Sequence, residues 1–260
     1  MDLQLAGRSI LITGASSGIG LATARMLADE GARLALCARD EQRLREATAD
    51  IAARTEVVYA ACDVTDRGSV DRFVAAAVAE FGGIDGVVCN AGRSLMRTLD
   101  DTTDDEIRDE FDLKIFGALH VIRSARKALA TSDAGSVVVI NAILSRQPEL
   151  RLAATAAARA GLLNLSRSLA GDLAGDGIRV NSVLLGLIDT GQWQRRFAEG
   201  DTTADFAEWS AEIAQDRGIA LGRFGTAEEL AFPVTTLLSP RNSYMTGAAL
   251  EVGGGVHRYV

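Results

Sequence analysis

The chain has 260 residues, a formal net charge of -8 and a pI near 4.9. Hydrophobic residues make up 48% of it and charged residues 24%, which excludes a disordered protein and a small disulfide-stapled scaffold. The acidic balance leaves no excess of positive charge, so nucleic acid and anionic membrane surfaces are disfavoured as partners.

Short β-rich runs alternate with segments of helical length from one end of the chain to the other. Runs that are apolar on both faces are typical of parallel sheets covered by helices on each side. The expected fold class is therefore α/β, a Rossmann-type, doubly wound, seven-stranded parallel sheet with helices on both faces. The expected strands are Ser9–Thr13, Arg33–Ala38, Glu56–Ala61, Ile84–Asn90, Ser136–Asn141, Ile178–Leu184 and Ala248–Val252.

Helical periodicity and turn residues predict where helices begin and end. Gly31 and Gly82 follow helical runs as C-caps, and two threonines, Thr103 and Thr226, precede a glutamate at capping-box spacing. The clearest expected helices are Ile19–Asp29, Glu41–Ala53, Ser69–Phe81 and Ala153–Ala174.

Residues 1–260 are expected to form one domain, because no linker, repeat or charge block divides them. One segment, Thr190–Gly222, interrupts the rhythm of strands and helices. Loops of that length are usually functional or disordered, and Trp193 and Trp209 argue against disorder. We expect a lid over a ligand at about residues 190–222; a decorative helical insertion is the alternative.

The first expected strand leads into a glycine-rich turn and then a helix. The turn contains Gly14, Gly18 and Gly20. Glycines let the backbone approach a pyrophosphate, and the helix N-terminus supplies N–H donors and partial positive charge. The strand, turn and helix context makes this motif informative and predicts a dinucleotide site.

Together, several motifs resemble the short-chain dehydrogenase/reductase family over nearly the whole chain. They are Thr13–Gly20 (TGASSGIG), Asp63-Val64, Asn90-Ala91-Gly92, Ile178–Asn181, Leu221–Gly225, Thr246-Gly247 and Gly253-Gly254. The resemblance implies that Asp63 and Val64 edge the adenine, that Asn90–Gly92 back the nucleotide, and that Gly186–Thr190 border the nicotinamide. It also implies a homodimer or a homotetramer. The cofactor-binding residues expected on these grounds are Gly14, Ser16, Ser17, Gly18, Ile19, Gly20, Arg39, Asp63, Val64, Asn90, Ala91, Gly92, Arg159, Gly186, Ile188 and Thr190.

The end of the second strand distinguishes between NADP(H) and NAD(H). A carboxylate there would accept hydrogen bonds from a free ribose 2′-hydroxyl, but Ala38 and Arg39 occupy this place. A guanidinium binds a 2′-phosphate in a bidentate fork, so NADP(H) is favoured over NAD(H). The alternative is a solvated Arg39 that the neighbouring Asp40 partly neutralises.

The catalytic positions depart from the family. The resemblance implies a tyrosine and a lysine on one helix, a serine before them and an asparagine on the preceding helix. Thr155, Arg159, Ala142 and Lys114 stand at these four positions. A threonine hydroxyl does not titrate near neutrality, and an arginine stays protonated.

Lys114 is the best available proton donor, because Arg159 would face the same pocket and a second cation, together with burial, lowers a lysine pKa. Its alternatives are an anchor for a substrate carboxylate or phosphate, and a side chain turned toward Asp112 or solvent. Thr155 and Arg159 complete the expected catalytic set. Ser145 enters the site only if its loop folds back, and His120 is expected to be structural; no metal site is expected.

The leading hypothesis is an NADP-dependent oxidoreductase, of the carbonyl reductase or alcohol dehydrogenase type, with a non-standard active site and a small-molecule substrate. The alternatives are a non-catalytic NADP-binding protein or regulatory subunit, and an enzyme that uses the cofactor structurally. Three cysteines at the ends of apolar runs are typical of buried thiols in a reducing compartment. No apolar stretch reaches the ~20 residues of a membrane span and no basic leader begins the chain, so we expect a cytoplasmic protein.

Overall fold

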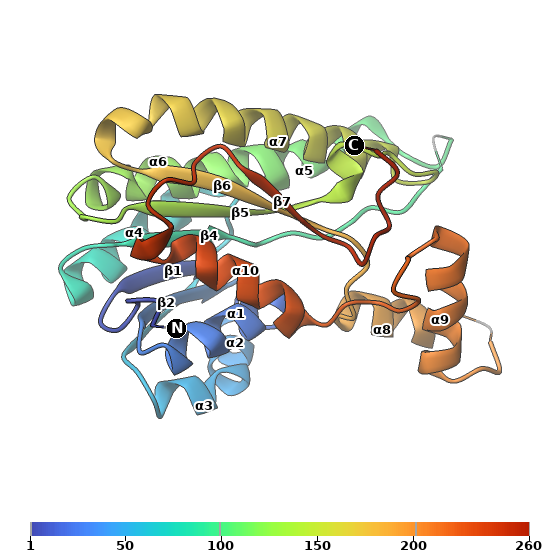
Figure 1. The fold of residues 1–260 in the computed structure, drawn as a ribbon, viewed down its shortest axis with the longest axis horizontal. Helices are drawn as coiled ribbons and strands as arrows, with labels where there is room; N and C mark the ends of the chain where they lie inside the picture. The colour runs from blue at the N-terminus through green and yellow to red at the C-terminus, as the bar shows by residue number, and fades with distance from the viewer. Residues whose placement is uncertain (1, 99, 201, 260) are drawn as a thin grey trace.

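A computed structural model describes residues 2–98, 100–200 and 202–259. Seven parallel strands form one sheet in the order β3-β2-β1-β4-β5-β6-β7 (Figure 1). The predicted fold class is confirmed, and the strand boundaries differ from the predicted ones by two residues at most. The strands are β1 (Ser9–Thr13), β2 (Arg33–Ala38), β3 (Val57–Ala61), β4 (Gly86–Cys89), β5 (Ser136–Ala142), β6 (Arg179–Leu185) and β7 (Ala249–Val252).

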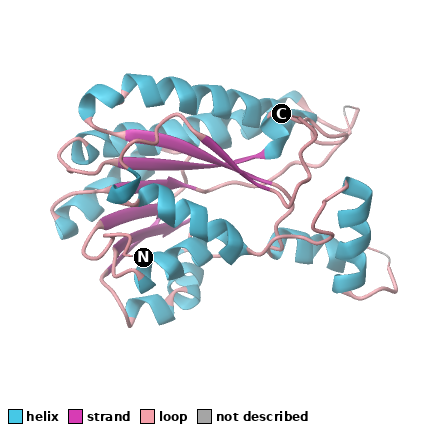
Figure 2. Ribbon diagram, viewed as in Figure 1, coloured by secondary structure: helices cyan, strands magenta, loops and turns pink. Residues whose placement is uncertain are grey.

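Helices cover both faces of the sheet (Figure 2). The α-helices are α1 (Gly18–Asp29), α2 (Glu41–Ala47), α3 (Ala49–Ala52), α4 (Arg67–Phe81), α5 (Asp104–Phe111), α6 (Gly117–Leu129), α7 (Ala153–Asp172), α8 (Gly191–Ala198), α9 (Phe206–Arg217) and α10 (Ala227–Leu238). A π-helical turn, η1 (Asp112–Phe116), joins α5 to α6, and three short 3₁₀ turns are η2 (Ile143–Ser145), η3 (Ala174–Asp176) and η4 (Pro240–Asn242).

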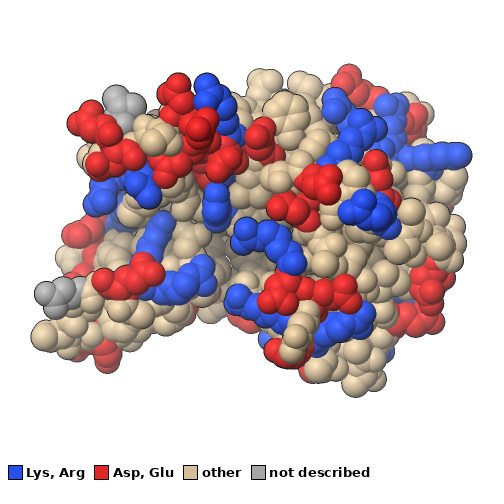
Figure 3. All heavy atoms as spheres, turned by 180° about the vertical axis from the view of Figure 1, so that it is seen from behind, with Lys and Arg blue, Asp and Glu red and all other residues tan. Residues whose placement is uncertain are grey.

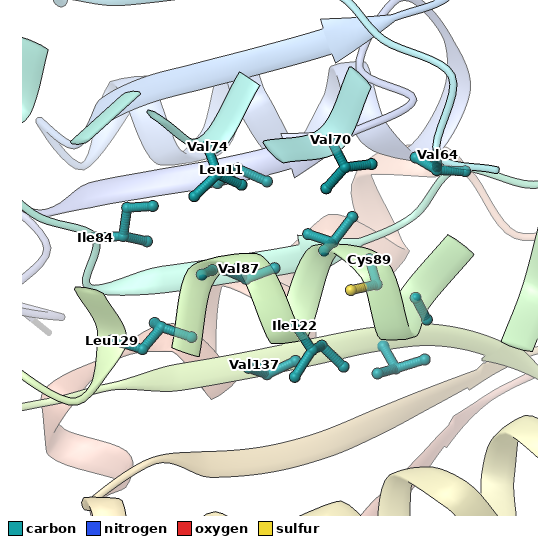
Figure 4. Packing of buried hydrophobic residues seen from close by; sticks show 14 of the residues in the cluster. Leu11, Val64, Val70, Val74, Ile84, Val87, Cys89, Ile122, Leu129 and Val137 are labelled. Carbon is teal, nitrogen blue, oxygen red and sulfur yellow. The ribbon is translucent and has the colours of Figure 1, made fainter. Parts of the chain in front are cut away.

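Alternation along the strands divides the core into two clusters. Leu11 of β1 packs with residues of α4 and α6 on one face, as Figure 4 shows, whereas Ile10 and Ile12 pack with α1 and α10 on the other. These side chains are almost completely buried. Burial of apolar surface on both faces stabilises the sheet and explains why its strands are apolar throughout.

The predicted helix ends are confirmed where a local motif defines them. Thr103 and Thr226 both form capping boxes, and Gly82 ends α4 with a φ of 79°. The predicted helix at residues 41–53 is instead interrupted at Thr48. The buried Thr48 hydroxyl donates to the Leu44 carbonyl at 2.8 Å and lies 3.1 Å from the Tyr59 hydroxyl of β3, so a tertiary contact divides α2 from α3.

The segment from Thr190 to Gly222 contains α8 and α9, which lie beside the carboxyl edge of the sheet (Figure 1). Its two tryptophans pack edge-on, with ring centroids 6.1 Å apart. Phe197, Phe206 and Phe224 complete an aromatic cluster with them. The predicted lid comprises α8 and α9, and we call them the lid helices below after that prediction. Within the part of the chain that the structure describes, no helix is long and apolar enough to cross a membrane.

Candidate active site

A cleft of about 690 Å³ opens at the carboxyl ends of the strands. It lies where the strand order reverses, because β1 is flanked by β2 on one side and β4 on the other. Ligands of doubly wound sheets bind at this switch point. Of the expected cofactor-binding residues, every one except Gly20 lines the cleft: Gly14, Ser16, Ser17, Gly18, Ile19, Arg39, Asp63, Val64, Asn90, Ala91, Gly92, Arg159, Gly186, Ile188 and Thr190.

The glycine-rich turn leaves room for a ligand against the backbone. Gly14 and Gly18 have positive φ values of 66° and 53°. The Asn90 side chain donates to the Thr13 and Gly14 carbonyls at 2.9 and 3.0 Å, which joins this turn to the end of β4. Ser17 precedes α1 without a side-chain cap, so N–H groups of the first helical turn have no side-chain partner. Such groups fit a pyrophosphate.

Gly20 lies beneath this turn rather than in the cleft. A Cβ atom at Gly20 would lie 2.3 Å from the Gly14 carbonyl oxygen and 2.5 Å from Asn90 Nδ2. Gly20 is therefore required for close packing of α1 against the turn. It affects ligand binding only indirectly, through the shape of that turn.

We expect Gly20→Ala to lower the free energy of unfolding by about 1–3 kcal/mol, because overpacking forces the turn and α1 apart. The displaced turn should also bind NADPH more weakly. Urea denaturation and calorimetry measure the two effects, with Gly83→Ala as control, since a Cβ at Gly83 meets nothing within 4 Å. Equal stability of the two variants would show that the turn adapts at no cost.

Two arginines that follow the second strand also line the cleft, Arg39 after β2 and Arg43 in α2. The neighbouring Asp40 caps α2 by accepting the Arg43 backbone N–H at 3.0 Å. Asp63 accepts hydrogen bonds from the Thr65 backbone and hydroxyl, which lower its pKa, and the charge of Arg39 acts in the same direction. Sequence reasoning missed Arg43, although its position four residues after Arg39 was the available signal.

Lys114 lies on the π-helical turn η1, with only 2% of its side chain exposed. Its Nζ forms an ion pair with Glu110 Oε2 at 2.6 Å and donates to the Arg93 carbonyl at 2.9 Å. The insertion of a π-turn re-aims side chains within a helix. Lys114 does not line the main cleft, and the alternatives that turn it toward Asp112 or solvent do not match these contacts.

The side chain of Thr155 is completely buried and lies outside the main cleft. Its hydroxyl donates to Glu110 Oε2 and accepts the Leu95 backbone N–H at 3.1 Å. Glu110 thus joins Lys114 to Thr155 inside the protein. Sequence reasoning missed Glu110, although a glutamate four residues before a lysine on a helix is a recognised pairing signal.

Arg159 is buried but borders the cleft. Its Nη1 donates to the Ile140 carbonyl at 2.8 Å, while Nε has no hydrogen-bond partner among the described residues. Desolvation lowers its pKa to about 10. Ala142 lines the cleft at the serine position. The Ser145 hydroxyl is buried, has no hydrogen-bond partner in the described part of the chain, and does not border the cleft.

The expected fall in the Lys114 pKa is confirmed in direction. Burial is the largest cause, the charge of Arg159 is the second, and the Glu110 carboxylate opposes both, which together lower the pKa to about 8. A cavity of about 20 Å³ lies between Lys114 and Arg159 and shares Gly92 and Ile140 with the main cleft. This is room for one water molecule.

His120, the histidine expected to be structural, lies outside this set, with Nδ1 2.9 Å from the Val64 carbonyl oxygen.

Comparison with known proteins agrees with this geometry. The family model described as enoyl-(acyl carrier protein) reductase matches residues 14–257. The chain belongs to the short-chain dehydrogenase/reductase family. It is 31% identical over 255 residues to a 3-oxoacyl-(acyl-carrier-protein) reductase of Salmonella typhimurium, covering 98% of this chain and 99% of the relative. This short-chain dehydrogenase/reductase is therefore an oxidoreductase by family.

Two solved structures of the family are similar over their full length. One is an NADPH-bound short-chain oxidoreductase of Pseudomonas aeruginosa PAO1 described as containing an atypical catalytic center, with a TM-score of 0.93, 39% identity, and coverage of 98% of this chain and 99% of that one. The other is L-sorbose reductase of Gluconobacter frateurii complexed with NADPH and L-sorbose, with a TM-score of 0.96, 31% identity, and coverage of 100% of both chains.

Proposed function

We propose that this chain is an NADP(H)-dependent oxidoreductase that interconverts a small carbonyl compound and an alcohol, with Lys114 as its proton source. The observation that carries the proposal is that the cleft and the small cavity at Lys114 are adjacent and share lining residues. Arg159 lines both the cleft, which includes the glycine-rich turn, and the small cavity, which reaches Lys114. The NADPH complexes of two similar proteins support the choice of cofactor.

The residues present fit a dinucleotide. A Cβ at Gly14 would lie 2.9 Å from the Ala91 Cα and one at Gly186 2.7 Å from the Gly253 Cα, so the cleft wall is backbone at both places. Arg39 and Arg43 would bind the 2′-phosphate, the first turn of α1 the pyrophosphate, and Arg159 a ribose hydroxyl through its unpartnered Nε. When bound, the nicotinamide supplies or accepts the hydride.

The chain's own residues would supply the proton. The tyrosine position holds Thr155, whose hydroxyl already bonds with Glu110 and Leu95 and does not reach the cleft. Lys114 is the buried group with a pKa of about 8, near the working pH of a general acid. One water in the small cavity would connect its ammonium to the cleft beside Arg159. Thr155 would hold Glu110, and Arg159 would lower the Lys114 pKa.

The direct test is oxidation of NADPH by the purified protein with a panel of aldehydes, ketones and oxo acids, followed by the absorbance of the reduced nicotinamide. Transfer of deuterium from labelled NADPH to the product identifies hydride transfer. If NADPH binds but no member of the panel accepts deuterium, a non-catalytic NADP-binding protein becomes the better explanation.

Arg39 is expected to make NADP(H) bind more tightly than NAD(H) by about 1–3 kcal/mol, the value of charge-assisted hydrogen bonds to phosphate. Arg39→Asp should reverse the order, because a carboxylate binds the free ribose and repels the phosphate. Calorimetry with both cofactors measures the difference. Arg45→Asp on α2 is the control, since Arg45 does not line the cleft. Equal affinities in the unmodified protein would contradict the proposed preference.

We also propose a homodimer or homotetramer in the cytoplasm. Ala153, Ala157 and Ala160 form an exposed row of small side chains along α7, which permits close approach of a second helix. The described cysteines, Cys37, Cys62 and Cys89, are free and buried, as in proteins of reducing compartments. The lid helices border the cleft through Trp193, so we propose that they close over the substrate within a single domain of residues 1–260.

A further inference from the structure

Two adjacent arginines of the lid helix α8, Arg195 and Arg196, line the cleft. Neither forms an ion pair with any described carboxylate, and Glu199 acts on Arg196 only through its charge. Two other arginines that line the cleft do have carboxylate partners, since Arg217 pairs with Glu149 and Arg93 lies 3.9 Å from Asp109. Figure 3 shows several basic side chains around the hollow on this face of the molecule.

Arg196 is held in place by aromatic packing. Its guanidinium carbon lies 4.7 Å from the ring centroid of Trp193, and Trp193 packs against Phe224 at 5.0 Å. Arg196 is half-buried, and desolvation lowers its pKa. A stacked and partly desolvated guanidinium that pairs with none of the described carboxylates is a positioned cation, and its planar donors match a carboxylate or phosphate.

The helix α8 begins beside the glycine-rich turn and carries these arginines along the cleft. Thr190, directly before α8, lies against the glycine-rich turn, because its Cγ2 is 3.4 Å from a Cβ built at Gly18. Arg195 and Arg196 lie in the second turn of α8. The Arg195 guanidinium reaches back to within 3.3 Å of a Cβ built at Gly191, whereas Arg196 stacks on Trp193. The cleft lining includes Trp193, beside Arg196, and Met96, which suit the apolar part of a substrate.

We propose that Arg196, with Arg195 beside it, forms a subsite for an anionic group, a carboxylate or a phosphate, on the substrate. This subsite proposal rests on the proposed function, because it takes the ligand beside α8 to be the substrate of the oxidoreductase. The phosphates of the dinucleotide are a second source of the same chemistry, and the experiment separates the two sources.

The experiment measures binding without turnover. Protein saturated with NADP+ has no hydride to give, so oxo acids bind to it without being reduced. Calorimetry then compares two matched pairs, benzoylformate with its methyl ester and acetoacetate with its methyl ester. We expect at least one acid to bind about 10- to 100-fold more tightly than its ester, the range of hydrogen bonds to a charged group.

Arg196→Met keeps the apolar stem and removes the larger part of the charge at the subsite, so it should bring the affinity of that acid most of the way down to that of its ester while NADP+ affinity stays the same. Arg123→Met is the matched control on α6, where Arg123 is exposed and outside the cleft, and it should change nothing. The proposal is overturned if neither acid binds better than its ester. It is also overturned if Arg196→Met weakens NADP+ binding as much as acid binding, since Arg196 would then bind the cofactor.

These outcomes are independent of the redox test. A preference for the acid that depends on Arg196, in a protein that never oxidises NADPH, would leave the subsite standing and refute the oxidoreductase. NADPH oxidation with equal affinities for acid and ester would do the reverse.

Discussion

Lys114→Met is expected to lower kcat for carbonyl reduction by about 10²–10⁴-fold, the usual contribution of a general acid, while NADPH affinity changes little. Lys114 lies outside the main cleft and reaches it only through the small cavity at Arg159. Its removal therefore takes away the proton without removing a dinucleotide residue, but it also leaves the buried Glu110 carboxylate without its ion-pair partner, so the stability of the variant is measured as well. Steady-state kinetics and calorimetry on the same preparation measure the two quantities.

The pH dependence of the reduction rate is a second test of Lys114 as the proton donor. Glu110 of α5, Arg159 of α7 and Arg93 after β4 face the Lys114 ammonium, and their balance with burial gives a pKa of about 8. The protonated form is the donor. The rate of reduction should therefore be constant below pH 8 and fall above it, whereas the rate of alcohol oxidation should rise through the same range.

Lys114→Arg separates the proton from the charge. A guanidinium keeps the positive charge but does not release a proton near neutrality. If Lys114 donates the proton, this variant should be as slow as Lys114→Met. Full activity in Lys114→Arg, or a loss confined to KM in Lys114→Met, would instead make Lys114 an anchor for a substrate anion. The ammonium of Lys114 already forms a 2.6 Å ion pair with Glu110. Its positive charge is therefore largely neutralised, which makes Lys114 a poor anchor for a substrate anion.

The parts of the molecule that local chemistry determines were predictable from the sequence. Strand β1 and its glycine-rich turn are examples, because apolar runs, glycines and a following helix are adjacent in the chain. The capping boxes at Thr103 and Thr226 are others, since their partners lie three residues away. The apolar runs form the strands of the sheet, and the sheet brings the dinucleotide residues to its carboxyl edge.

The contacts between distant segments could not be predicted in this way. Thr155 and Glu110 are 45 residues apart, and only the packing of α7 on α5 brings the hydroxyl to the carboxylate. The division of the predicted helix at Thr48 likewise depends on Tyr59 in the next strand. The sequence predicts that Lys114 is a cation facing a pocket. Its pairing with Glu110 and its position outside the main cleft depend on the tertiary structure.

Glu110→Ala is expected to lower the free energy of unfolding by about 3–5 kcal/mol, the usual cost of leaving one member of a buried ion pair without its partner. Both side chains of the Glu110–Lys114 pair are only 2% exposed, so the unpaired ammonium stays shielded from bulk solvent. Urea denaturation measures the loss. Glu110→Leu combined with Lys114→Met should be less destabilised than Glu110→Ala, because it buries no charge.

The milder variant Glu110→Gln tests whether Glu110 also positions and tunes Lys114. The carboxylate raises the Lys114 pKa against burial and the charge of Arg159, so its neutralisation should lower that pKa further. The fall of the reduction rate should then begin below pH 8. A merely structural glutamate would weaken folding in Glu110→Ala but leave the pH profile of Glu110→Gln unchanged. If the pH profile of Glu110→Gln moves to lower pH while NADPH affinity stays constant, Glu110 is a positioning residue for Lys114. Glu110 does not line the cleft, so its substitution can change the pH profile only through its electrostatic effect on Lys114.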